Sequence, residues 1–294
     1  MRYPLYNLSI FKAAYVVAQL LPRPIAQWVA GGFGDWSVWR SAELRRVMGA
    51  NLHIATGESG DGLRALVLRN VQNFAKQIAD YFLCNGPDAA EHAHRIVGGW
   101  SGWEHLTASR ERGKGTILVT GHLGHWELGG LLLARAGVPI TVVTLPEPSP
   151  ELMQWREKAR KALGIRTIAV GPGHDFSFVE MLRTLRGNGV LAMLVDRPYS
   201  GTGLPVQQFG HTTEFSTAAA TLAHHTGASI VPAFVMRQPD SRYHAFCEPA
   251  VEQATGPLRE TLADNVQRIA DIFTALIAQH PEQWFNYAPL FQRE

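Results

Sequence analysis

The stretch TILVTGHLGHWELGG, residues 116–130, decides the fold and points to a site. It begins with a short apolar run rich in β-branched residues, which predicts a buried strand over 116–120. Glycines follow at once and predict a turn, and the residues from Trp126 onward favour a helix. Repeated alternation of strands and helices is typical of an α/β fold.

His122 and Glu127 stand five positions apart in this stretch. On a regular helix two such side chains point about 140° apart, so at least one of them must lie on the turn. With His122 on the turn and Glu127 on the first helical turn, the carboxylate can fold back onto the imidazole and fix its tautomer. The alternative is that His122 and His125 are ordinary turn residues and that Glu127 complements the helix dipole.

Further sequence blocks follow in order along the chain. They are RGNG at 186–189 with VLAMLVDRP at 190–198, VQQFG at 206–210, FSTAAA at 215–220, GASIVPAF at 227–234 and HPEQWF at 280–285. Together with GHLGHWE at 121–127 they resemble the lipid A biosynthesis lauroyl/myristoyl acyltransferase family, within the lysophospholipid acyltransferase-like superfamily. The resemblance extends from about residue 5 to residue 292.

The resemblance implies a glycerolipid acyltransferase-like mechanism in which His122 is the general base and Glu127 orients it. The donor would be an acyl thioester of acyl carrier protein, less readily of coenzyme A, and the acceptor a hydroxyl of a lipid A precursor or related glycolipid. No covalent acyl-enzyme and no cofactor are expected. The residues expected to bind substrate are Gly121, His125, Trp126, Arg183, Arg186, Asp196 and Arg197.

Several of these residues have plainer interpretations. Asp196 and Arg197 at a strand tip suit a structural ion pair as well as a substrate contact, and Arg183 and Arg186 suit the solvated face of a helix. His125, where related enzymes often carry Asn, would bond locally or contact the acceptor.

A metal site is not expected. His122 and His125 form a His-x-x-His pair, but this spacing differs from the helical His-Glu-x-x-His pattern and no third ligand is apparent. Cys84 and Cys247 are far apart and lack metal-ligand spacing, which also argues against a disulfide framework.

Composition bounds the remaining possibilities. A chain of 294 residues is long enough for one large α/β domain, and no low-complexity linker or internal repeat divides it. A net charge of +2 without a Lys/Arg-rich tract gives no support for nucleic-acid binding.

The N-terminal segment is expected to contact a membrane surface. The apolar stretch 5–21 is interrupted by polar residues before it reaches the length of a membrane-spanning helix. A peripheral or monotopic, interfacial arrangement fits better, with Arg40, Arg45 and Arg46 available for anionic lipid. The segment carries an apolar stripe of Leu5, Leu8, Phe11, Ala14 and Tyr15, with Trp28, Trp36 and Trp39 nearby. The alternative is that this stripe packs on the protein core.

The expected architecture is therefore a membrane-associating helical segment at 1–50 and an acyltransferase α/β domain at 51–294 with a mixed, helix-covered sheet. Strands are predicted at 116–120, 140–144, 168–170, 190–195, 230–236 and 242–248, and helices at 63–82, 127–136, 150–163, 176–186, 216–226 and 258–279.

The function expected from the sequence is acyl transfer at the cytoplasmic face of the bacterial inner membrane. Two other classes stay open: a catalytically silent lipid-binding protein of the same fold, and a metal-dependent hydrolase of lipid esters or thioesters. The intact pair of His122 and Glu127 argues against the silent protein.

Overall fold

The computed structural model describes residues 8–86, 88–145, 149–171, 173–198, 201 and 203–291. Its centre is a seven-stranded sheet of order β1-β9-β8-β2-β5-β3-β4, with a separate two-stranded ribbon of β6 and β7. Every neighbouring pair in the large sheet is parallel except β8 and β9. The strands are β1 (Val97–Ser101), β2 (Thr116–Thr120), β3 (Ile140–Thr144), β4 (Arg166–Ala169), β5 (Val190–Leu194), β6 (Gly203–Gln208), β7 (His211–Ser216), β8 (Ser229–Arg237) and β9 (Tyr243–Cys247).

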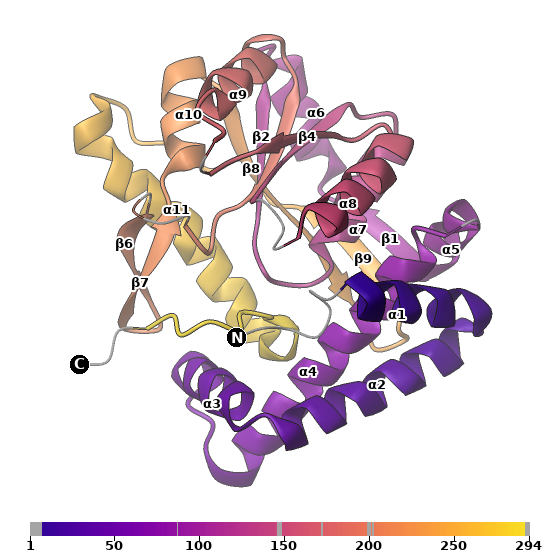
Figure 1. Ribbon diagram of the computed structural model, residues 1–294. Helices are drawn as coiled ribbons and strands as arrows, with labels where there is room; N and C mark the ends of the chain where they lie inside the picture. The colour runs from indigo at the N-terminus through magenta and orange to yellow at the C-terminus, as the bar shows by residue number, and fades with distance from the viewer. Residues whose placement is uncertain are drawn as a thin grey trace.

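Helices cover both faces of this sheet (Figure 1). Strand β2 explains the division, because successive side chains of a strand point to opposite faces. Ile117 and Val119 face a cluster that includes α9, α10 and α11, whereas Leu118 faces α6 and α7. The helices are α1 (Leu8–Leu20), α2 (Arg23–Arg40), α3 (Ala42–Thr56), α4 (Gly60–Leu83), α5 (Ala89–Ile96), α6 (Trp103–Glu111), α7 (Trp126–Arg135), α8 (Pro150–Ala162), α9 (Ser177–Arg186), α10 (Ala218–Thr226), α11 (Leu258–Gln279) and the short 3₁₀ helix η2 (Pro281–Gln283).

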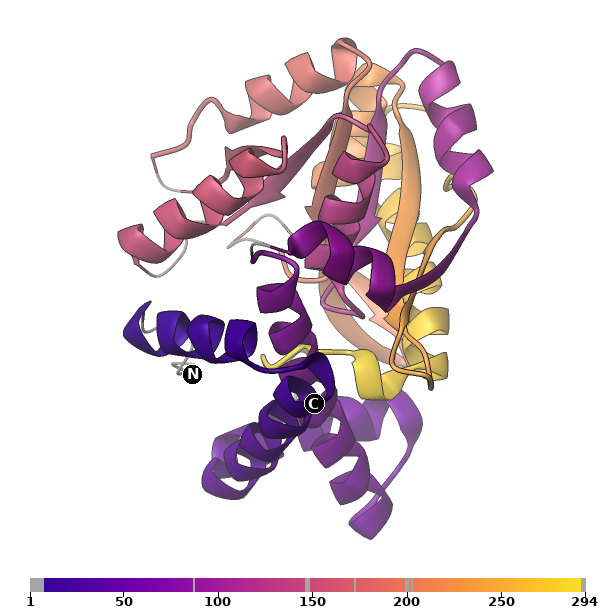
Figure 2. The ribbon, with the colours of Figure 1, turned by 90° about the vertical axis from the view of Figure 1, so that its right-hand side faces the viewer.

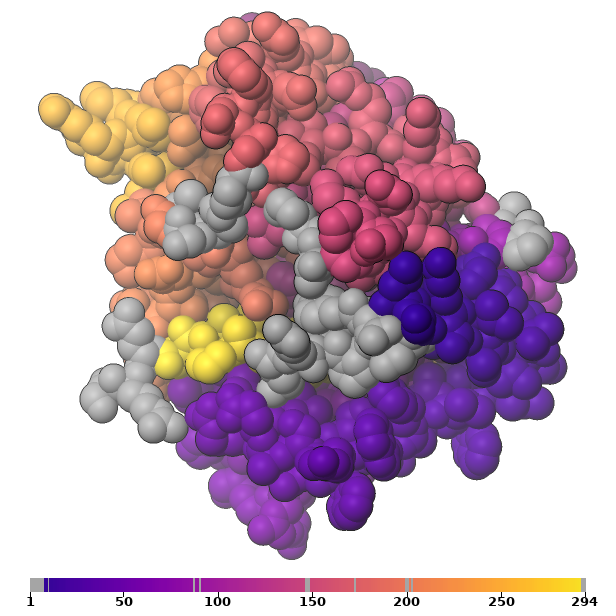
Figure 3. Space-filling model, viewed as in Figure 1, coloured from indigo at the N-terminus to yellow at the C-terminus, as the bar shows by residue number. Residues whose placement is uncertain are grey.

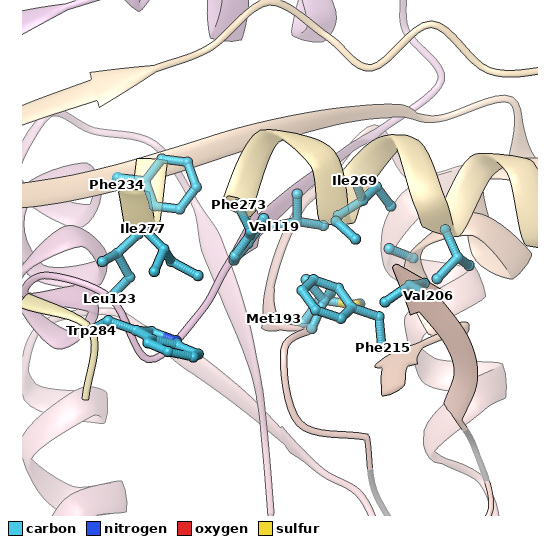
Figure 4. Close-up of a cluster of buried hydrophobic side chains, with 14 of the residues drawn as sticks. Val119, Leu123, Met193, Val206, Phe215, Phe234, Ile269, Phe273, Ile277 and Trp284 are labelled. Atoms are coloured by element: carbon cyan, nitrogen blue, oxygen red, sulfur yellow. The ribbon is translucent and has the colours of Figure 1, made fainter. Parts of the chain in front are cut away.

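The main core lies between the sheet and α11. Ile269, Phe273 and Ile277 follow one face of α11 at helical spacing, and each is at most 1% exposed. Figure 4 shows Ile269 and Phe273 on the side of α11 where Val119 lies, and Ile277 nearer to Leu123. The same cluster continues to Trp284 and Leu123, so the core extends directly beneath the turn that carries His122.

The N-terminal helices form a layer at the base of the molecule (Figures 2 and 3). Helix α2 packs along α4, and the carboxylate of Asp80 on α4 fixes it there. This carboxylate is fully buried and accepts hydrogen bonds from Arg23 (2.8 Å) and Gln27 (2.8 Å) of α2 and from the hydroxyl of Tyr243 (2.9 Å) of β9. Three elements are therefore joined at one carboxyl group, which suits the rule that buried polar groups are hydrogen-bonded.

The predicted α/β class and the mixed, helix-covered sheet are confirmed. Strand β1 and the β6/β7 ribbon were not predicted, because Val97–Ser101 contains two glycines and Gly203–Gln208 contains a proline, both unfavourable in strands.

The apolar stripe predicted on α1 packs on the protein core. This was the alternative to contact with a membrane surface. Phe11 is 2% exposed and contacts Phe82 and Trp155 edge to face, and Tyr15 contacts the same two rings. Leu5 lies outside the described residues. The exposed apolar side chains of this layer are instead Val16, Val17 and Leu20 of α1 and Ile25, Trp28, Val29, Phe33, Trp36 and Trp39 of α2. Among the described residues, no helix is both long and apolar enough to cross a bilayer.

Candidate active site

The turn between β2 and α7 holds His122 in a conformation that depends on two glycines. Gly124 has a φ of +61°, a region that L side chains rarely adopt, and a side chain there would strike the carbonyl oxygen of Val235. At Gly121 a Cβ atom would lie 2.9 Å from Cγ of Asp196. Glycine at this position therefore allows the Asp196 carboxylate to approach the turn.

A segment that follows α11 clamps the same turn from the other side. The amide of Phe285 donates to the carbonyl of His122 (2.6 Å), and the amide of Gly124 donates to the carbonyl of Gln283 (2.9 Å). The side chain of Gln283 makes two further bonds to the backbone of Arg237, one as acceptor (2.8 Å) and one as donor (2.9 Å). Asn70 of α4, fully buried, donates to the carbonyl of Trp284 (2.7 Å) and so holds the clamp in place.

The imidazole of His122 is oriented by Asp196. Nδ1 of His122 lies 2.9 Å from Oδ1 of Asp196, and the backbone amide of His122 donates to Oδ2 at 2.8 Å. An ionised carboxylate can only accept, so Nδ1 carries the proton and Nε2 has a free lone pair. Among the described residues Nε2 has no hydrogen-bond partner, and the His122 side chain is 22% exposed.

Asp196 carries a negative charge, as a group that orients the His122 imidazole should. Burial alone would raise the pKa of the carboxyl group, but the interactions with the ring and amide of His122 outweigh burial, and the pKa lies below its ordinary value. Asp196 is therefore ionised at neutral pH and favours the imidazolium form that a general base acquires.

Glu127 does not occupy the orienting position that the sequence predicted for it. It lies on the first turn of α7 and faces α8, where Arg160 bonds it at 3.1 Å and Arg156 at 3.3 Å. Burial would raise the pKa of Glu127, but the two guanidinium groups overcome this and lower it. The reason for the difference is topological: β5 lies beside β2 and parallel to it, so the residue just beyond the tip of β5 reaches His122 first.

His125 is the N-cap of α7. Its Nδ1 accepts a long bond from the amide of Leu128 (3.4 Å), and its own amide donates to the carbonyl of Val235 (2.7 Å). This is the position at which Asn is favoured, and Nδ1 provides a comparable acceptor. The ring is 1% exposed, and burial lowers its pKa to about 4, so it is neutral. Of the two predicted roles, the structure shows the local bond.

The other predicted substrate-binding residues divide into two groups. Trp126 and Arg197 line a cavity beside His122, and the Trp126 ring lies 5.3 Å from the imidazole, centroid to centroid. Arg183 and Arg186 are not brought to the site: α9 leads into β5 through a short turn, so its last turn lies at the amino end of the parallel strands, opposite Asp196. The predicted ion pair of Asp196 with Arg197 is replaced by the pair of Asp196 with His122.

The cavity is large and mainly apolar. Its volume is about 1600 Å³, and its walls come from the sheet, from α7 and from the N-terminal helices α1 and α2. Figure 3 shows one face of the molecule, on which the N-terminal helices lie below the part that contains the sheet. His122, Glu127 and Arg160 also line it, so the polar groups of the site adjoin a space suited to a hydrocarbon chain. Within the described part of the chain, no group of three or more His, Cys, Asp or Glu residues is arranged to hold a metal ion.

Comparison with known proteins identifies the family of this chain. The family model for bacterial lipid A biosynthesis acyltransferase matches residues 1–293. The chain belongs to that family. It is therefore an acyltransferase of the lipid A type, and the resemblance noted in the sequence is confirmed.

Curated relatives of this acyltransferase are also known. Proteins from two strains of Mycobacterium tuberculosis, each named phosphatidylinositol mannoside acyltransferase, are 27% identical over 249 residues, covering 84% of this chain and 76% of theirs. A protein of the same name from Mycolicibacterium smegmatis is 25% identical over 186 residues, covering 63% of this chain and 60% of its own length.

The side chains that Asp196 and Glu127 contact were not predicted from the sequence. The signal for Asp196 was present, because residues at the carboxyl ends of adjacent parallel strands meet at one edge of a sheet. Arg156 and Arg160 are spaced i, i+4 on α8 and so share one helical face, but which acid they would meet depends on how α8 packs. The clamp by Gln283 and Phe285 lies in the HPEQWF block, but its bonds to the turn of His122 are made by backbone groups, whose partners the sequence does not reveal.

Proposed function

We propose that this acyltransferase moves a fatty acyl chain from a thioester donor to a hydroxyl of a glycolipid, with His122 as general base and Asp196 as the group that orients it. The observation that carries the proposal is an imidazole bonded through Nδ1 to a buried carboxylate, with its Nε2 unpartnered among the described residues, beside an apolar cavity of about 1600 Å³.

The chemistry follows from that geometry. Nε2 of His122 takes the proton of the acceptor hydroxyl while the oxygen attacks the thioester carbonyl. The tetrahedral intermediate collapses, the carbon–sulfur bond breaks, and the leaving thiolate takes the proton from the imidazolium. Asp196 remains ionised throughout and stabilises the imidazolium. The products are an ester and a free thiol, and no cofactor takes part.

The donor and acceptor are proposed by class. A thioester of acyl carrier protein is the preferred donor and coenzyme A the second, as the family resemblance implies. The acceptor is a sugar hydroxyl of a glycolipid, either a lipid A precursor or a phosphatidylinositol mannoside, since the family and its relatives carry these two names. Arg197, exposed at the cavity wall, is suited to a phosphate of either substrate.

We also propose that the N-terminal segment, residues 1–50, associates with the membrane, at the cytoplasmic face of the bacterial inner membrane. Trp28 and Trp39 of α2 are 78% and 74% exposed, and Trp36 is 49% exposed. Indole rings favour the interface between lipid headgroups and chains. Because α1 and α2 also line the cavity, a lipid substrate would pass from the bilayer to His122 along these helices.

The test measures transfer of a radiolabelled acyl group from its thioester with acyl carrier protein or with coenzyme A. The acceptors are a lipid A precursor and a phosphatidylinositol mannoside. His122→Ala is expected to lower kcat by about 10²–10⁴-fold, because a general base contributes a factor of that size. Asp196→Asn should also lower kcat, and by more than Glu127→Gln, since only Asp196 bonds the imidazole.

The matched control is His94→Ala, which removes an exposed histidine of α5 that does not line the cavity. Equal activity of His122→Ala and the wild type, with both folded, would refute the assignment of the base. A larger loss in Glu127→Gln than in Asp196→Asn would return the orienting role to Glu127.

A further inference from the structure

The turn that carries His122 lies between the end of strand β8 and the segment that follows α11. On the β8 side the amide of His125 donates to the carbonyl of Val235 (2.7 Å), and a Cβ at Gly124 would strike the same carbonyl oxygen. On the other side the C-terminal segment accepts from the amide of Gly124 (2.9 Å) and donates from the amide of Phe285 to the carbonyl of His122 (2.6 Å). The position of the imidazole therefore depends on how these two supports lie relative to each other.

The side chain of Gln283 joins the two supports. Its Oε1 accepts from the amide of Arg237 (2.8 Å), and its Nε2 donates to the carbonyl of the same residue (2.9 Å), at the last position of β8. The backbone carbonyl of Gln283 accepts from Gly124. Together with the bond from His125 to Val235, these contacts form a closed ring through the turn, β8 and the C-terminal segment.

The bonds to Arg237 require a side chain with a donor and an acceptor. The amide of Gln283 supplies both, an aliphatic side chain supplies neither, and an ionised carboxylate supplies only acceptors. The Gln283 side chain is buried, at 5% exposure, so the peptide groups of Arg237 would be left without a partner if the amide were removed. Backbone groups make the other bonds of the ring, and a substitution does not remove them. Gln283 is therefore the position at which the ring can be opened.

Helix α4 fixes the C-terminal segment from below. Asn70 is fully buried and donates to the carbonyls of Pro281 (3.1 Å) and Trp284 (2.7 Å). The Trp284 ring is 1% exposed and lies near Leu123 of the turn in the main core (Figure 4). The segment is thus a fixed support for the turn, and Gln283 connects this support to the sheet.

We infer that Gln283 is a positioning residue for acyl transfer. By tying the C-terminal segment to β8, it holds His122 where Asp196 bonds Nδ1 and where Nε2 is available to the acceptor hydroxyl. The assignment rests on the proposed function, because it takes His122 to be the general base. Gln283 is not among the residues that line the cavity, so it acts through the backbone of the turn. A displacement of a reacting group by about 1 Å can lower a rate by about 10²-fold.

The experiment compares Gln283→Met with a matched control, Gln208→Met. Methionine has about the length of glutamine but neither of its amide groups. Gln208 is also buried, at 3% exposure, and its Nε2 bonds Ala270 (3.4 Å) and Thr274 (2.9 Å), but it lies on β6, outside the ring. In Gln283→Met we expect kcat to fall by about 10–100-fold. The KM values for donor and acceptor should stay as in the wild type, and Gln208→Met should keep the wild-type kcat.

A second readout does not depend on turnover. Proton NMR detects the Nδ1 proton of His122, because its bond with Asp196 slows exchange with water, and the loss of the signal in His122→Ala identifies it. We expect the signal to broaden or disappear in Gln283→Met and to persist in Gln208→Met. A folded Gln283→Met variant with wild-type kcat and an unchanged signal would overturn the inference and leave the proposed reaction intact. A changed signal in Gln283→Met, with full activity in His122→Ala, would mean that the proposed reaction alone fails.

Gln283→Glu serves if Gln283→Met does not fold. A protonated carboxyl group can accept from the amide of Arg237 and donate to its carbonyl, whereas an ionised one can only accept. The ratio of the variant's kcat to that of the wild type is therefore expected to fall as the pH rises, because ionisation removes the donor. A ratio that stays at one across the pH range would overturn the inference.

Discussion

Helices α2 and α11 are both long and rich in apolar residues, but the large apolar side chains are buried in α11 and exposed in α2. In α11 the large apolar side chains point inward, and Ile269, Phe273 and Ile277 are at most 1% exposed. In α2 the buried positions are Ala26, Gln27, Gly31 and Gly34, and the large side chains are at the surface. The apolar residues of α11 therefore stabilise the fold, whereas those of α2 are available to a lipid surface or to the cavity.

The largest expected difference between the two helices is in stability. Phe273→Ala removes a fully buried ring and should lower the free energy of unfolding by about 3–5 kcal/mol. Phe33→Ala makes the same change in α2 at a residue that is 41% exposed, and it should cost about 1 kcal/mol or less. Urea unfolding of both variants measures the difference. Similar losses in the two variants would mean that α2 contributes to the core as α11 does.

The junction between α2 and the sheet is expected to weaken in acid. The His125 ring packs 5.1 Å from Tyr243, whose hydroxyl bonds the Asp80 carboxylate that fixes α2. Burial lowers the pKa of His125 to about 4 in the folded protein, against an ordinary value of 6.5. Between these values the unfolded chain binds a proton that the folded chain does not, so stability falls as the pH decreases from 6.5 toward 4.

The expected loss over this range is about 3 kcal/mol. His125→Asn keeps an N-cap side chain on α7 and removes the titrating group, so its stability should fall by that much less between the same two pH values. Urea unfolding at both pH values gives the comparison. Parallel curves for wild type and variant would exclude His125 as the source of acid sensitivity.

The smallest effect concerns the outer face of α2. Replacing Trp28 and Trp39 with Ser should change the free energy of unfolding by no more than about 0.5 kcal/mol, because both rings are largely exposed. Affinity for vesicles that contain anionic lipid, measured by flotation, should fall by about tenfold or more. Trp100→Ser, at a partly exposed ring of β1, serves as the control. Unchanged flotation of the double variant would remove the membrane role proposed for α2.

Much of the fold could be predicted from the sequence. Apolar, β-branched runs located β2, β3, β5 and β8, and helical periodicity located α4 and α11, because these elements are long or regular enough to show a period. Strand β1 and the β6/β7 ribbon escaped prediction, since their pairing outweighs glycine and proline that disfavour strands.

The residues of the candidate site were easier to predict than the contacts between them. His122 and Asp196 were both named, yet the carboxylate assigned to the imidazole was Glu127, the nearer one in sequence. Proximity along the chain was a poor guide because β5 is placed beside β2 by the sheet, and the sheet order is set by long-range packing. The inward direction of Phe11 and Tyr15 was predicted only as the alternative, because either face of an amphipathic helix can contact protein or lipid.

The backbone bonds from Gln283 and Phe285 to the turn of His122 have a consequence for biosynthesis. A ribosome makes the turn early and the clamp late, after α11 has been synthesised. A nascent chain that stops before Gln283 has every residue of the proposed catalytic pair but lacks the bonds that hold its turn. If His122 and Asp196 are the catalytic pair, an unfinished polypeptide is therefore not expected to transfer acyl groups before Gln283 and Phe285 have been added.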